Sequence, residues 1–201
     1  MRAKIVIAGI VAGIAVFAWE SVWHMVLPFG ETGVKSVLNE DPIIAAMRDN
    51  MHERGYYFVP GAFAPPDATK EQKGEANKQW AQKAAAGPNA IIVYNPNGYT
   101  MGPRLFVTEF LLNVVLSWIA AMLLAQASGA LPKFGSRVIF VTWIGVFGAL
   151  ATNVAYWNWY NYPPDFSVAA IAEGILAGVV MGLVLAPMIK PSVPASDTSR
   201  S

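Results

Sequence analysis

Four long apolar segments constrain the fold of this chain more than any other feature of its sequence. Each is long enough to cross the hydrocarbon core of a bilayer as a helix, which takes about 20 residues. Backbone polar groups in lipid must be satisfied within the protein, so a lone spanning segment of this length is helical. The sequence therefore predicts an α-helical integral membrane protein with four transmembrane helices, at residues 5–27, 105–127, 137–159 and 166–189.

The composition agrees with this prediction. Hydrophobic residues make up 55% of the chain and charged residues 13%, whereas soluble proteins have roughly 25% charged residues. The first apolar segment is longer than the hydrophobic region of a signal peptide, and no clear cleavage pattern follows it. We therefore expect a retained first helix.

The stretch between the first two apolar segments has a different character. Asp41-Pro42 predicts a helix N-cap followed by proline at the first helical position, with the helix ending near Gly55. A second, polar helix is predicted at 67–86, and two short strands at 56–59 and 90–94 are expected to pair. The predicted organisation is a first transmembrane helix at 1–28, a small α+β extracytoplasmic cap at 29–103, transmembrane helices two to four at 104–189, and a disordered cytoplasmic tail at 190–201.

Basic residues beside the apolar segments predict the orientation of the chain. They gather on one side of a four-span topology, and the turn at 160–166 contains no lysine or arginine. The positive-inside rule then places both termini in the cytoplasm and the cap in the periplasm or outside the cell, as in a multi-pass protein of the bacterial inner membrane. The flanking basic residues are Arg2, Lys4, Lys133, Arg137 and Lys190. An aromatic belt is predicted at the outer membrane surface, formed by Trp19, Trp23, Tyr156, Trp157, Trp159, Tyr160, Tyr162 and Phe166.

Polar side chains inside the apolar segments are predicted to form one cluster. Glu20 and His24 share a helix face because they are four residues apart. Helical rise places the polar residues of all four helices at nearly one depth in the outer half of the membrane. The predicted buried polar cluster comprises Glu20, His24, Glu109, Asn113, Asn153 and Glu173.

This cluster has four interpretations from sequence. It is a hydrogen-bond network that fixes helix register, or a metal site built from Glu20, His24, Glu109 and Glu173. Carboxylate-bridged metal bundles use Glu-x-x-His, however, whereas this chain has Glu-x-x-x-His. A proton or small-solute path is disfavoured because residues 5–18 contain no polar side chain. The fourth interpretation is a pigment or haem bound by His24, so the cofactor is unknown at this stage.

Glycines at four-residue spacing predict close helix packing, because small residues let helix backbones approach each other in lipid. One strip comprises Gly174, Gly178 and Gly182, and a shorter one Gly9 and Gly13. The partner of each strip is another helix of this chain or a helix of another protein.

Several function classes find no support in the sequence. The chain has no cysteine, hence no disulfide, thiolate metal site or catalytic thiol. It has no G-x-S-x-G elbow, no H-E-x-x-H motif and no glycine-rich phosphate loop. The net charge of +1 gives no reason to expect nucleic-acid binding. These observations favour a non-enzymatic role.

The layout resembles an uncharacterised family of small four-helix bacterial membrane proteins with a periplasmic insert after the first helix. The resemblance lies in the run NMHERGYY at 50–57, in WNWY at 157–160 followed by Tyr162-Pro163, and in Glu173 before the glycine strip. It covers most of the chain and implies no known activity.

The function expected from sequence is that of a non-enzymatic accessory or structural subunit in a larger membrane protein assembly. Its partners would be the lipid bilayer and other membrane protein subunits. The alternative is a membrane-embedded metal- or cofactor-binding protein that uses the Glu/His cluster.

Overall fold

The computed structural model describes residues 2–61 and 63–191 and divides the chain into two compact units. The helix unit comprises Met1–Lys35 and Met101–Ser201, and the cap unit comprises Ser36–Thr100. The chain is mostly helical, and four of its described helices are long and apolar enough to cross a membrane, as predicted. These four are α1 (Arg2–Met25), α4 (Pro103–Ala127), α5 (Phe134–Tyr160) and α6 (Pro164–Met188), with a short 3₁₀ helix, η1 (Ser128–Ala130), after α4.

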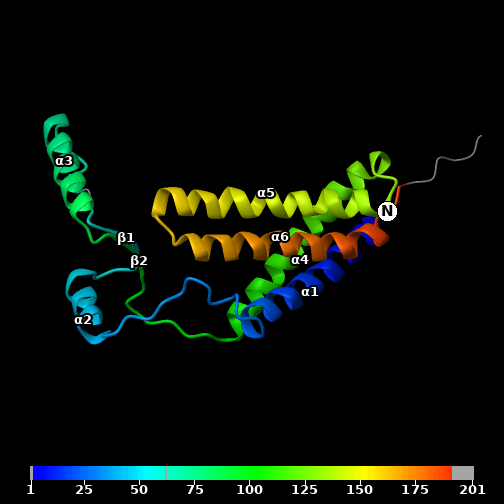
Figure 1. Cartoon of the computed structure of the whole chain (residues 1–201), viewed down its shortest axis with the longest axis horizontal. Helices are drawn as coiled ribbons and strands as arrows, with labels where there is room; N and C mark the ends of the chain where they lie inside the picture. Colours follow the sequence, from blue (N-terminus) through cyan, green and yellow to red (C-terminus); the bar gives the residue numbers. More distant parts are fainter. Residues whose placement is uncertain (1, 62, 192–201) are drawn as a thin grey trace, which may run out of the picture. The chain divides into compact units, whose positions relative to one another are not determined.

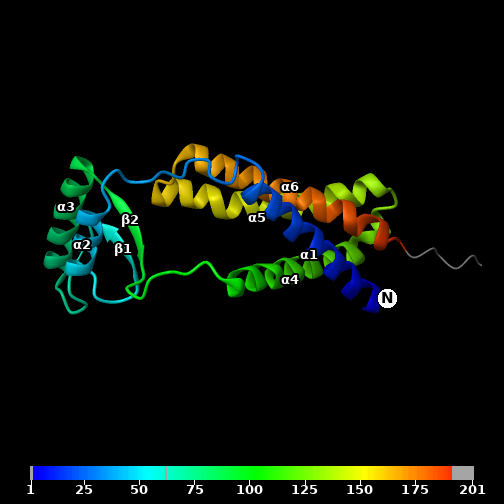
Figure 2. The ribbon, with the colours of Figure 1, turned by 90° about the horizontal axis from the view of Figure 1, so that it is seen from below.

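The helix unit is built from two pairs of helices. Helix α1 packs along α4, α5 packs along α6, and α1 also packs along α6, whereas α4 and α5 touch only slightly. Figures 1 and 2 both show α4 diverging from α5 and α6 with distance from the α4–α5 connection. Helix α1 therefore joins the two pairs.

Glycines make the close contacts within each pair. A Cβ atom added at Gly13 would lie 2.6 Å from the Cα atom of Val114 on α4, so no larger residue fits there without displacing backbone. On the other pair, a Cβ atom at Gly178 would lie 3.0 Å from the Cα atom of Gly145 on α5. All five glycines of the predicted strips face a helix of this same chain: Gly9 and Gly13 face α4, and Gly174, Gly178 and Gly182 face α5.

The buried apolar core lies at the end of the helix unit where α1 begins. Its side chains are small or branched, which suits the close approach of the helices. The core comprises Ala8, Ala12, Ala120, Ala121, Leu124, Val141, Leu185 and Ile189. We call this part of the helix unit the core end.

Arg137 is buried at the core end, with 5% of its surface exposed. Its Nε donates to the Ala186 carbonyl near the end of α6 at 2.9 Å. Its Nη1 donates to the carbonyls of Leu131 at 3.0 Å and Pro132 at 2.8 Å. Carbonyls near helix ends lack partners within the helix and attract cations, so Arg137 joins the end of α6 to the α4–α5 connection. The sequence predicts only a basic residue flanking a transmembrane helix at this position.

The cap unit contains α2 (Asp41–Asn50), β1 (Gly55–Val59), α3 (Lys70–Ala86) and β2 (Ala90–Tyr94). The two strands pair antiparallel, with Tyr57 opposite Ile92, which confirms the predicted pairing. Thr69 caps α3 in a capping box with Gln72. No residue in the described part of the cap unit is buried, and a two-stranded sheet alone is only marginally stable.

The structure corrects several predicted boundaries. Helix α2 ends at Asn50, five residues before the predicted end at Gly55, because the chain becomes extended at Met51 and enters β1. Glu40 occupies the N-cap, and Asp41 is the first helical residue. Helix α5 begins at Phe134, three residues before the predicted start at 137. The predicted disordered tail is described only at Lys190 and Pro191, and its residues 192–201 lie outside the described part of the chain.

Candidate functional site

The polar residues of three helices meet at the end of the helix unit opposite the core. Asn113 Nδ2 on α4 donates a hydrogen bond to Glu20 Oε2 on α1. One turn further along α1, His24 Nε2 lies 2.9 Å from Glu173 Oε1 on α6. Together these two contacts link α1 to both of its neighbouring helices. We call the part of the helix unit that contains these residues the polar end.

Glu109 belongs to the same group but has no hydrogen bond to it. It lies one turn before Asn113 on α4, and its carboxyl group interacts electrostatically with those of Glu20 and Glu173. Unlike Asn113, which is buried, Glu109 is exposed. The name polar cluster is used from here on for Glu20, His24, Glu109, Asn113 and Glu173.

Asn153 does not join the polar cluster through any described hydrogen bond. Its Nδ2 donates to the Ala149 carbonyl of its own helix, α5, at 3.0 Å. Equal depth along the helices placed Asn153 in the predicted cluster, but depth does not fix the direction in which a side chain points. The structure thus brings together five of the six predicted cluster residues.

The segment after α1 folds back against the polar end. A Cβ atom at Gly30 would lie 2.7 Å from the His24 Cα atom, and one at Gly33 would lie 2.7 Å from the Phe166 Cβ atom. Gly33 also has a φ of 77°, which favours glycine. Trp23 is buried, and its ring contacts those of Trp19 and Phe29. These contacts hold the helix that carries Glu20 and His24 in place.

Exposure differs across the polar cluster. The His24 side chain is 55% exposed and that of Glu173 19% exposed. The imidazole of His24 is thus half-exposed, whereas the carboxyl group that pairs with it is mostly buried. In the described part of the chain, no lysine or arginine side chain forms an ion pair with Glu20, Glu109 or Glu173.

The geometry gives the metal interpretation no ligand set. Among the described residues, no group of three or more histidine, aspartate or glutamate side chains is arranged to hold a metal ion. The pairwise arrangement explains this, because Glu20 bonds to Asn113 and Glu173 pairs with His24. The metal site from Glu20, His24, Glu109 and Glu173 stays a prediction from sequence.

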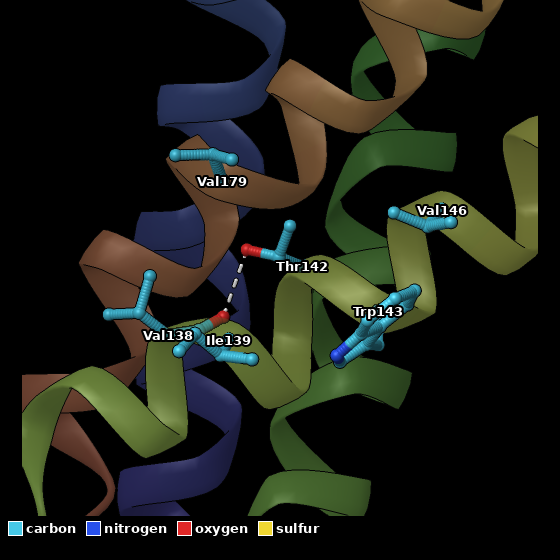
Figure 3. A pocket seen from close by; sticks show the side chains of 6 residues that line it. All are labelled: Val138, Ile139, Thr142, Trp143, Val146 and Val179. Atoms are coloured by element: carbon cyan, nitrogen blue, oxygen red, sulfur yellow. Dashed lines mark hydrogen bonds between the residues drawn. The ribbon is translucent and has the colours of Figure 1, made fainter.

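A separate apolar pocket of about 450 Å³ lies on α5 and α6. It is lined by Val138, Ile139, Thr142, Trp143, Val146 and Val179 (Figure 3). Thr142 Oγ1 donates to the Val138 carbonyl at 3.0 Å, so the hydroxyl group of the lining is already satisfied. The pocket contains no titratable side chain and is an open apolar depression between neighbouring side chains.

Sequence reasoning missed two features of the helix unit. The first is the burial of Arg137. The sequence feature that could have indicated it is an arginine that follows a proline-containing connection between two helices. The second is the exposure of Glu109. Its position along the helix predicts a depth in the membrane, but it does not predict the direction in which the side chain points. No protein family, curated protein or solved structure matches the chain. The resemblance to small four-helix membrane proteins therefore also stays a prediction.

Proposed function

We propose that this chain is an integral protein of the bacterial inner membrane, with α1, α4, α5 and α6 as its spans. The proposed topology has cytoplasmic termini and places residues 29–103 in the periplasm or outside the cell. Large apolar side chains exposed along the four helices support insertion, for example Phe147 on α5, which is 75% exposed. Exposed Trp157 and Trp159 near the end of α5 support an aromatic belt.

Within the membrane, the proposed role is that of a non-enzymatic accessory or structural subunit of a larger assembly. The observation that carries this proposal is the exposed side chain of Glu109, the one acidic residue of α4. An acidic side chain facing lipid costs about 2.5–3.5 kcal/mol on insertion scales, and such groups almost always face protein or water. Among the described residues, no side chain donates a hydrogen bond to the Glu109 carboxyl group or forms an ion pair with it. A partner subunit would supply the missing contacts.

The cap unit supports the same proposal by independent reasoning. It has no buried residue among those described, and Val93 on β2 is 77% exposed. Small domains that bury little apolar surface gain stability from association. A periplasmic partner surface would provide that burial.

The glycine strips, in contrast, no longer argue for a partner. Their close contacts are made within the chain, so they account for the packing of the helix pairs. The proposed assembly must therefore use another surface.

Purification of the tagged chain from its native membrane in mild detergent tests this proposal. We expect a second membrane protein to co-elute at a fixed ratio, identified by mass spectrometry. Recovery of the chain as a monomer under several mild detergents would overturn the proposal. An absorption spectrum and elemental analysis of the same sample would detect a bound pigment or metal and thereby test the alternative role.

A further inference from the structure

One exposed stripe of α4 has the pattern of a helix-packing seam. Its members alternate at spacings of four and three residues, which is the repeat that keeps side chains facing a partner helix. All are exposed, and all but one are apolar. The α4 seam comprises Leu105, Glu109, Leu112, Leu116, Ile119 and Leu123.

The other side of α4 is already occupied. Its buried residues, among them Asn113, Ser117 and Ala121, lie on the side that packs against α1. Gly9 and Gly13 of α1 face Trp118 and Val114. The α4 seam residues are exposed in the described helix unit, and α4 diverges from α5 with distance from the α4–α5 connection (Figures 1 and 2).

Glu109 gives the seam its specificity. A single polar residue in an apolar seam fixes register and partner choice at a cost in stability. Leucines alone would be satisfied by lipid, which is as apolar as they are. Lipid does not satisfy the carboxyl group of Glu109, so this residue selects a helix that offers a hydrogen-bond donor or a positive charge.

We infer that the α4 seam docks a transmembrane helix of a different protein that presents a lysine or arginine side chain opposite Glu109. This inference rests on the proposed role as a subunit. Charge complementarity carries the choice of partner. The carboxyl groups of Glu20 and Glu173 interact electrostatically with Glu109, and the imidazole of His24 is paired with Glu173.

A second copy of this chain fits the seam less well. Two copies lie in the membrane with the same orientation, and a two-fold interface places the same surface patch of each copy together. Glu109 would then face another Glu109 at the same depth. The nearest basic residue on α4 is the exposed Arg104, which lies five residues earlier, about 7.5 Å along the helix axis.

Site-specific cross-linking from native membranes tests the inference. The chain has no cysteine, so a single introduced cysteine carries a photoreactive label without competition. Leu112→Cys places the label in the α4 seam, and Phe147→Cys places it on an equally apolar, exposed surface of α5 as a control. Glu109→Gln is then compared with Glu31→Gln, which removes an exposed carboxyl group outside the spans.

We expect the label at position 112, and not that at 147, to join the chain to another membrane protein within an apolar segment that contains a lysine or arginine. Glu109→Gln should lower recovery of that protein at least about tenfold, in line with truncation of a charge pair at an interface, while Glu31→Gln leaves it unchanged. Exchanging the two charges, with Glu109→Lys here and glutamate at the basic position of the partner, should restore recovery.

Three results would overturn the inference. A cross-link from position 112 to a second copy of this chain would replace the proposed partner with a homodimer. A co-purifying protein that cross-links from position 147 alone, or that Glu109→Gln leaves unaffected, would refute the seam and leave the proposed subunit role standing. A monomer with no cross-link from either position would refute both proposals.

Discussion

The core end and the polar end of the helix unit satisfy their polar groups in opposite ways. At the core end, Arg137 is buried and donates to three backbone carbonyls. At the polar end, Glu20 accepts a hydrogen bond from Asn113, Glu173 pairs with His24, and Glu109 is exposed. The comparison shows that the buried arginine at one end is bonded within the chain, whereas one carboxyl group at the other end is exposed.

Helix packing explains why the two ends differ. Alanine and glycine let all four helices converge near the core end, whereas α4 diverges from α5 towards the polar end. Divergence exposes one stripe of α4, and the carboxyl group of Glu109 lies within it. The polar cluster thus combines a structural role in joining α1 to α4 and α6 with an exposed group available to a partner.

The largest expected effect is the loss of stability when the close contact between α5 and α6 is disrupted. Gly178→Leu would drive a side chain into the backbone of α5, since a Cβ atom alone lies 3.0 Å from the Gly145 Cα atom. We expect a loss of stability above about 3 kcal/mol, the upper end of overpacking costs, measured by thermal unfolding in detergent. Gly148→Leu on α5 is the matched control, because a Cβ atom there meets nothing within 4 Å. Equal losses in the two variants would contradict the packing described here.

A smaller effect is expected at Arg137. Arg137→Met keeps the aliphatic volume but leaves the carbonyls of Ala186, Leu131 and Pro132 without their donor. We expect a loss of about 2 kcal/mol, as for unsatisfied buried polar groups, measured by the same unfolding assay. Lys133→Met, at an exposed residue of the same connection, should change stability little. If Arg137→Met were as stable as the parent chain, the core end would not depend on this arginine.

The smallest effect is expected inside the polar cluster. Asn113→Leu removes the hydrogen bond to Glu20 and should cost about 0.6 kcal/mol, the average for hydrogen bonds between membrane helices. Asn153→Leu should cost less, because the Asn153 amide bonds only to the backbone of its own helix. The reverse order in unfolding experiments would mean that Asn153, and not Asn113, joins the helices.

Much of this fold can be predicted from the sequence because apolar length and turn residues act locally. The four helices, the strand pair and the close-packing glycines follow from patterns within each segment. The rotation of each helix does not, because it depends on which neighbours pack against it. Asn153 and Glu109 illustrate this limit: both lie at the predicted depth, yet one bonds to its own backbone and the other is exposed. Arg137 adds a second limit. An exposed basic residue beside a helix and a buried arginine that donates to backbone carbonyls cannot be told apart from the sequence.

The most direct test of the contrast between the two ends is Glu109→Leu, measured in two settings. If Glu109 serves to bind a partner, the purified variant should unfold at a higher temperature than the purified parent chain. The reason is that an exposed acid beside two other carboxyl groups is replaced by an apolar residue. In the native membrane, the same variant should lose its co-purifying subunit. A lower unfolding temperature together with unchanged co-purification would show that Glu109 serves the interior of this chain, and would contradict the account.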